Sequence, residues 1–124
     1  DPSKAMTTLR TKSGITDAEW IRTTVDEARS DPVGMWRIVR AGREGFALVG
    51  GDLEDFVHRF IAEMIKAGAA PVIGDITAPF GWSPVLKYGE DPTKVADALV
   101  SEWLASKSDP DVDGIWFAFQ AVWK

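Results

Sequence analysis

Three aspartates at alternating positions, Asp109, Asp111 and Asp113, come closer than any other residues of this sequence to the spacing of a metal site. With Gly114 they match positions 1, 3, 5 and 6 of a calcium-binding loop, in which carboxylates bind the ion and glycine permits the turn. Position 12 is Gln120, whereas a calcium loop has a bidentate glutamate there. The residues that follow also favour a strand over the exit helix of such a loop. We therefore expect an aspartate-rich turn without a metal, with calcium as the weaker alternative.

Residues 81–83 begin like the nucleophile elbow of a serine hydrolase, with Ser83 as the nucleophile. Val85 replaces the glycine that closes this motif. His58 is the one histidine that could serve as a base. It is expected on the polar side of a helix, one turn after Glu54, where an exposed pair with that glutamate is its default role. Because the catalytic set is incomplete, the sequence favours a protein that is not an enzyme.

The glycine pair Gly50-Gly51 precedes an expected helix, as in phosphate-binding turns. The GxGxxG spacing and the lysine of a phosphate-binding loop are missing, and Asp52, Glu54 and Asp55 would repel a phosphate at this helix end. One histidine and no cysteine cannot build a histidine-rich or thiolate metal centre. We expect no cofactor.

The loop at residues 74–84 is the most promising binding segment, because it is rich in proline, glycine and aromatic residues. Loops on a rigid scaffold often carry function, and aromatic rings beside a few polar groups suit a ligand or a partner. The alternative is a plain connection whose aromatic rings cover the helices. The candidate binding residues, from this loop and from elsewhere, are Asp75, Phe80, Trp82, Ser83, Trp116 and His58.

The chain is acidic, with a net charge of −5. This charge disfavours nucleic acids and anionic membranes as partners, and no apolar run approaches the ~20 residues of a membrane span. The absence of cysteine excludes disulfides and is compatible with the cytoplasm, where we expect the protein. The 124 residues predict one domain. We place it at residues 15–124, after a loose tail at 1–14 in which 1–5 are typical of an expression remnant.

Three segments have the apolar spacing and the end signals of helices. The clearest is residues 50–68, whose apolar residues follow the i, i+3, i+4, i+7 pattern and for which Asp52 is a natural N-cap. A first helix is expected after Thr16, which starts a capping box. A third is expected to begin at Pro92, with Asp91 as its N-cap.

The segments that are rich in β-branched and aromatic residues, and are expected as strands, are 35–40, 46–49, 71–76, 85–88 and 115–123. The first two flank a glycine-containing loop and predict a β-hairpin; the alternative is a helix over 32–40. From residue 46 onward the elements then follow the ferredoxin-like βαββαβ order. We therefore predict an α+β fold in which an antiparallel sheet carries two helices on one face, with an N-terminal helix and an extra strand or hairpin added.

The predicted last strand has apolar residues on both of its faces. Ile115, Phe117 and Phe119 alternate with Trp116 and Ala118, whereas a strand with one solvated face should alternate apolar with polar residues. Something must therefore cover the second face. The N-terminal helix, a second subunit and a ligand are the three alternatives.

Two functions are consistent with these observations. The favoured one is a small acidic interaction module without catalysis, which binds another protein or a second copy of itself; an inhibitor or immunity-type protein facing a basic target is one form. The alternative is a dimeric, ferredoxin-like enzyme or carrier that needs no cofactor and holds a small apolar ligand on its sheet face. Its polar groups would come from a set that the sequence does not rank: Asp75, Ser83, His58, Tyr88 and Gln120.

Overall fold

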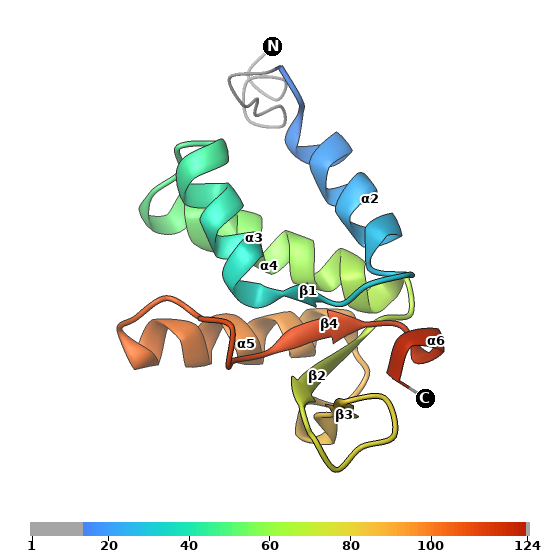
Figure 1. Cartoon of the computed structure of the whole chain (residues 1–124). Helices are drawn as coiled ribbons and strands as arrows, with labels where there is room; N and C mark the ends of the chain where they lie inside the picture. Colours follow the sequence, from blue (N-terminus) through green and yellow to red (C-terminus); the bar gives the residue numbers. More distant parts are fainter. Residues whose placement is uncertain (1–13, 124) are drawn as a thin grey trace.

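The computed structural model describes residues 14–123 of the chain (Figure 1). The predicted tail therefore lies, apart from Gly14, outside the described residues. The elements in chain order are α2 (Asp17–Glu27), β1 (Val33–Gly34), α3 (Met35–Arg40), the π-helix η1 (Ala41–Gly45), α4 (Gly50–Lys66), β2 (Ala70–Gly74), β3 (Trp82–Pro84), the 3₁₀-helix η2 (Leu86–Tyr88), α5 (Pro92–Ser106), β4 (Trp116–Ala118) and α6 (Gln120–Trp123).

The four strands form one antiparallel sheet in the order β1-β4-β2-β3. The C-terminal strand β4 lies inside this sheet, because Phe117 pairs with Val33 on one side and with Pro71 on the other. Helices α4 and α5 lie behind the sheet in Figure 1, while α2 and α3 pack against α4. The α+β class is thus confirmed, but this strand order and helix layout differ from the ferredoxin-like plan.

Helix α4 supplies more of the core than any other element, as its spacing predicts. Its buried residues form one continuous stripe: Leu53, Phe56, Val57, Phe60, Ile61, Met64 and Ile65. Burying each of these large side chains contributes about 1.5–3 kcal/mol relative to exposure. The helix begins at Gly50, earlier than expected, with Val49 rather than Asp52 as its N-cap. Asp52 lies in the first turn, where its negative charge still stabilises the positive end of the helix.

Helix α2 starts with the predicted capping box, in which the Thr16 hydroxyl accepts from the Glu19 amide at 3.1 Å. Trp20 then packs among aromatic rings of the core, the nearest being Phe60 at 5.2 Å between centroids. Asp17 is almost completely buried, 1% exposed, and forms an ion pair with Arg59 of α4. These contacts attach α2 firmly to α4.

The predicted hairpin over residues 35–49 is wrong, and the helical alternative is nearer to the structure. Met35, Ile38, Val39 and Gly42 are all buried in α3 and η1. Their spacing of i, i+3, i+4 and i+7 is helical, and it outweighs the short alternation that suggested a strand. Gly42 allows η1 to approach α4 closely, because a Cβ at this position would lie 2.6 Å from Leu53 Cδ1. Residues 46–49 are a connection rather than a strand.

The other strands are shorter than predicted or are displaced. The expected strand at 71–76 is β2, shifted by one or two residues, whereas 85–88 contains the 3₁₀-helix η2 and the strand lies before it as β3. The expected strand at 115–123 breaks after Ala118, and α6 follows. Helix α5, in contrast, begins as predicted, with the Asp91 carboxylate accepting from the Lys94 amide at 2.9 Å.

Candidate functional site

Three indole rings, those of Trp36, Trp82 and Trp116, gather on the face of the sheet away from the main core. Trp36 and Trp116 meet edge to face with centroids 6.4 Å apart, and Trp82 and Trp116 are tilted at 5.3 Å. The rings come from the first turn of α3, from β3 and from β4. We call these three residues the tryptophan face. Each of them is partly exposed, so the face is open to a partner.

The strand register explains why these rings share one face. Trp116 is paired with Gly34 of β1 and with Val72 of β2, and opposed residues of an antiparallel pair project to the same side. Gly34 has no side chain, and the Trp36 ring fills that space: a Cβ at Gly34 would lie 2.4 Å from Trp36 Nε1. The ring of Trp36 thus folds back over the strand that precedes its helix.

The structure around the tryptophan face shows what covers the second face of β4, the last strand. Val72 and Ala118 are fully buried, yet they lie outside the main core cluster. The neighbouring indole rings partly cover this side, and α6 contacts β3. Helix α2, one of the three alternatives, packs on α4 instead. The cover is therefore provided largely within the chain, by residues close to the sheet.

An acidic loop borders the tryptophan face on one side. The Trp116 indole donates from Nε1 to the Val112 carbonyl at 2.9 Å, which holds the 108–114 loop against this ring. The Asp111 carboxylate accepts from the Asp113 amide at 2.9 Å and stabilises the turn. Residues 108–114 contain three aspartates and neither lysine nor arginine. Asp109 is paired with Arg43, so the negative charge of this border comes from Asp111 and Asp113.

The loop between β2 and β3 borders the other side and is organised by Asp75. Its carboxylate accepts from the Ser83 hydroxyl at 2.6 Å and from the Thr77 amide and hydroxyl at 2.9 and 2.6 Å. These bonds, the Ser83 bond first, lower the pKa of Asp75, so the carboxylate stays charged at neutral pH. Residues 73–84 also contain neither lysine nor arginine. Both borders of the face are therefore negative.

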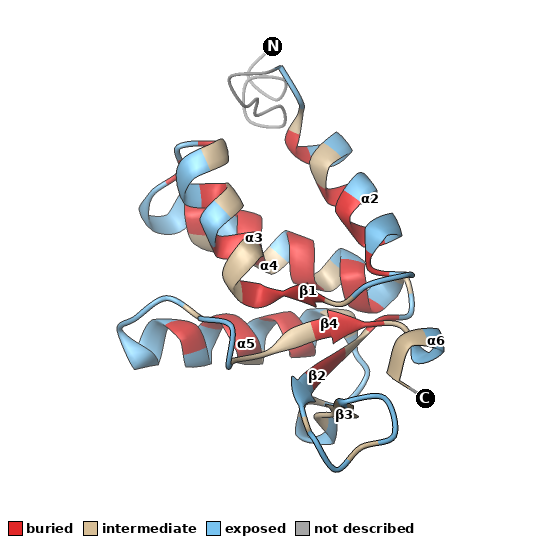
Figure 2. Cartoon of the chain, in the orientation of Figure 1, coloured by how far each residue is buried: buried red, intermediate tan, exposed pale blue. Residues whose placement is uncertain are grey.

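The same β2–β3 loop carries exposed apolar side chains. Ile76 is fully exposed and Phe80 is 61% exposed. Figure 2 shows this loop almost entirely in the colour of exposed residues, projecting away from the core. Apolar side chains that project together from a loop are typical of interaction surfaces. The alternative expectation, that Phe80 tucks over the helices, is not what the structure has.

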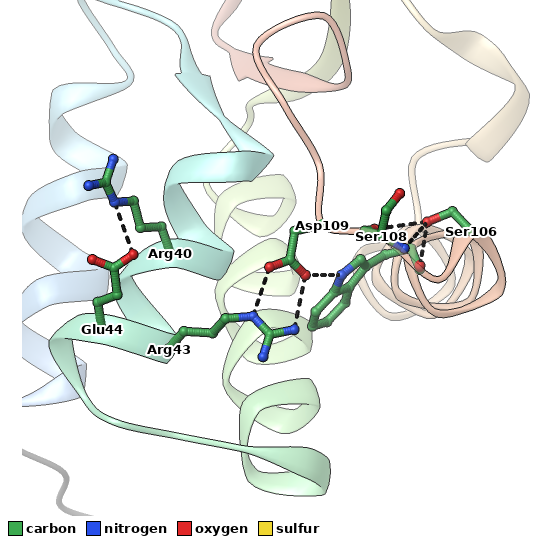
Figure 3. A network of polar contacts seen from close by, with 7 residues as sticks. Arg40, Arg43, Glu44, Ser106, Ser108 and Asp109 are labelled. Atoms are coloured by element: carbon green, nitrogen blue, oxygen red, sulfur yellow. Dashed lines mark hydrogen bonds and ion pairs between the residues drawn. The ribbon is translucent and has the colours of Figure 1, made fainter.

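The carboxylates of the three calcium candidates, Asp109, Asp111 and Asp113, do not come together as a metal site. Asp109 points away from the loop and accepts two hydrogen bonds from Arg43, at 2.8 and 3.0 Å, and a third from Trp103 Nε1 at 3.1 Å (Figure 3). The Arg43 bonds lower the pKa of Asp109. Within residues 14–123, no group of three or more histidine, cysteine, aspartate or glutamate side chains is placed to hold a metal. Asp109 instead ties the acidic loop to η1.

The residues considered for catalysis lie apart from one another. His58 contacts Asp97 of α5 through Nε2 at 2.6 Å, not Glu54 as expected, because α5 packs alongside α4. Ser83 bonds to Asp75 in the loop, so the serine has a carboxylate partner but no histidine. Tyr88 donates to Glu102 at 2.6 Å. Burial raises the pKa of this tyrosine above its ordinary value, which keeps it protonated.

The outer edge of the sheet offers little to an added strand. The backbone amide of Asp75 donates to the Gly81 carbonyl at 2.8 Å, and the backbone amide of Val85 donates to the Pro71 carbonyl at 2.9 Å. Alternate residues of an antiparallel strand point their backbone groups to opposite sides, so Pro84 directs its backbone away from β2. Proline has no N–H, so Pro84 cannot donate a hydrogen bond to a strand added at this edge.

Of the predicted binding residues, the structure brings together Trp82 and Trp116, and it joins Asp75 to Ser83. Phe80 lies in the same loop, whereas His58 belongs to the α4–α5 contact. Sequence reasoning missed Trp36 as part of the site, because the segment that holds it was assigned to a strand. The signal was the glycine two positions earlier, Gly34, which leaves room for a large ring. The chain matches no protein-family model, and the comparisons found no matching curated protein and no matching solved structure.

Proposed function

We propose that this chain is a small acidic interaction module whose tryptophan face binds a positively charged, arginine-bearing surface of another protein. The observation that carries the proposal is the arrangement of three partly exposed indole rings between two loops that hold aspartates and no basic residue. This form of the proposal assigns the chain no catalytic role. It includes the cytoplasm as the setting, which the cysteine-free composition permits.

Arginine is the cation that this surface suits best. A guanidinium group stacks on the face of an indole ring, and such a contact contributes about 0.5–1 kcal/mol at an exposed site. Asp113 of the 108–114 loop and Asp75 of the β2–β3 loop would attract the same charge. Ile76 and Phe80 add apolar area at the loop, which the partner would cover with its own apolar residues.

The same features argue against the other partner classes. The net charge of −5 repels nucleic acids and anionic lipids, and no helix among residues 14–123 is long and apolar enough to cross a membrane. Strand addition at β3 is disfavoured because Pro84 has no N–H on the free edge. Docking of side chains on the tryptophan face is the mode that remains.

A hexa-arginine peptide is a direct probe of the proposal. We expect it to change the tryptophan fluorescence and to bind with an affinity that falls as salt increases. Replacing Asp113 by Asn should weaken binding about two- to fivefold, as expected for an exposed charge pair. Asp55→Asn changes the net charge equally but lies on the exposed side of α4. It is the matched control and should leave the affinity nearly unchanged.

The oligomeric state separates the proposal from its alternative. Light scattering over a range of dilution should give a monomer, because side chains of the same chain already cover much of the second sheet face. Equal weakening by Asp113→Asn and Asp55→Asn would show that the peptide senses only net charge. Equal weakening, or a stable dimer that buries the rings, would contradict the proposed binding surface.

A further inference from the structure

A groove separate from the tryptophan face runs between α6 and the segment that follows β3. Its volume is about 840 Å³. Small-molecule sites commonly measure about 300–1,000 Å³. The walls come from the end of α4, the start of β2, residues 84–90 and the C-terminal residues 119–123. Nothing in the proposed interaction function uses this groove.

The groove is mainly apolar along its length. Its apolar walls include Ile65 at the end of α4, Pro71 of β2, Leu86 and Phe119. Leu86 is 79% exposed, and a ligand in the groove would cover part of it. Gly68, with a φ of 113°, lies at the floor beside the Phe119 ring. These walls suit the apolar body of a ligand.

One end of the groove carries positive charge. The Arg29 guanidinium lies 4.6 Å from the centroid of the Phe119 ring, which holds the cation at this end. Its ion pair with Asp26 is long, at 3.5 Å, and both side chains are well exposed, at 54% and 70%. A long, solvated pair of this kind contributes little, so Arg29 retains donors for an incoming anion. Glu90, the carboxylate of the lining, follows η2 in the chain.

A second donor in the lining of the groove has no acceptor among the described residues. The Trp123 ring lines the groove, and its Nε1 is buried without a hydrogen-bond partner among the described residues. An unsatisfied buried donor costs about 1–3 kcal/mol. This nitrogen is closed off from solvent as the ring stands, so a ligand oxygen accepts from it, and removes the cost, only when the ring turns toward the groove. Arg29 and Trp123 therefore both favour a ligand head group that accepts hydrogen bonds.

We propose that this groove binds a small apolar molecule with a carboxylate at one end, the head group lying toward Arg29 and the body along Leu86 and Ile65. The proposal does not rest on the interaction function, because no residue of the tryptophan face lines the groove. The expected ligand class is that of medium-chain fatty acids and of aromatic carboxylic acids.

The fluorescent probe anilinonaphthalene sulfonate, which is apolar and anionic, tests the groove. We expect the folded protein to bind it, decanoate to displace it, and decyltrimethylammonium at the same concentration to displace it far less. Leu86→Glu places a negative charge in the wall and should weaken probe binding about tenfold, since a like charge disfavours the anion. Val49→Glu is the matched control, because Val49 is 72% exposed and lies outside the groove.

The role of Arg29 has its own test. Arg29→Gln should weaken decanoate about fivefold, as expected for a solvent-exposed charge pair, while displacement by decanol, which carries no charge, should stay unchanged. Absence of probe binding, equal displacement by the cationic and anionic competitors, or equal effects of Leu86→Glu and Val49→Glu would overturn the proposal. Thermal unfolding of each variant verifies that the measured change is not a loss of fold.

Discussion

The indole rings of Trp82 and Trp116 lie 5.3 Å apart, although one belongs to the edge strand β3 and the other to the inner strand β4. Strand β2 lies between them. It pairs Trp116 with Val72 and Trp82 with Gly74, two residues further on and hence on the same face. The face thus depends on register as much as on the tryptophans themselves.

Gly34→Ala is predicted to disturb this face. The new Cβ would lie 2.4 Å from Cδ1 and Nε1 of Trp36, so the ring must move. Overpacking of this kind destabilises by about 1–3 kcal/mol. Chemical denaturation and the tryptophan emission maximum should both change. Gly74→Ala is the control, since no atom lies within 4 Å of its added Cβ; equal effects of the two substitutions would contradict the packing described for Trp36.

Arg59→Met is predicted to destabilise the attachment of α2. Asp17 is 1% exposed, so removing its partner leaves a buried, charged carboxylate that keeps the hydrogen bond from the Ala18 amide but has lost its ion pair. We expect the free energy of unfolding to fall by about 2–3 kcal/mol, which is less than for a fully buried pair because Arg59 is itself partly exposed. Lys66→Met, on the exposed side of the same helix, should change the unfolding free energy far less. Asp17→Asn should cost less than Arg59→Met, since it removes the buried charge.

Gly42→Ala tests the π-helix. The added Cβ would lie 2.6 Å from Leu53 and 3.0 Å from Phe56, and α3 could not stay as close to α4. A loss of about 1–3 kcal/mol is expected from this overpacking. Gly51→Ala meets nothing within 4 Å and lies in a helix, so it should be neutral or stabilising. Comparable losses in the two variants would show that the close contact at Gly42 is not what matters.

Acid is predicted to destabilise the protein through three carboxylates. Hydrogen bonds from Arg37, Ser83 and Arg43 lower the pKa of Glu27, Asp75 and Asp109, respectively. A lowered pKa in the folded state gives stability that is present above the unfolded value, about 4, and is lost as the pH falls through the folded value. The melting temperature should therefore drop below about pH 4. Glu27→Gln should flatten this drop, and an unchanged pH profile would show that the Arg37 pair contributes nothing.

The helices were the part of the fold that local sequence signals could predict. Thr16 and Asp91 cap their helices with their own side chains, and the apolar stripe of α4 is set by its spacing alone. The strands were harder, because β1 has two residues and β4 has three, too few to show a period. Their pairing is decided by contacts between distant segments, which is why the predicted topology differs from the sheet observed.

The candidate site was predictable in its parts but not as a whole. Trp82 and Trp116 were both expected to bind, yet nothing in the sequence shows that the two rings meet across β2. Trp36 escaped because the alternation in residues 35–40 resembled a strand, while the helical spacing of Met35, Ile38 and Val39 decided the structure. The acidic borders were visible in the sequence, where the aspartates at 109–113 were interpreted as a turn, with calcium as the weaker alternative, and were not connected to the basic target that the net charge suggested.

The indole N–H resonances of the six tryptophans, followed by NMR during titration with hexa-arginine, test the central claim most directly. The account predicts that the signals of Trp36, Trp82 and Trp116 shift together and saturate, while those of Trp20 and Trp103, which pack into the main core, stay in place. Shifts confined to other tryptophans, or no shift in any indole at saturating peptide, would contradict the tryptophan face as the binding surface.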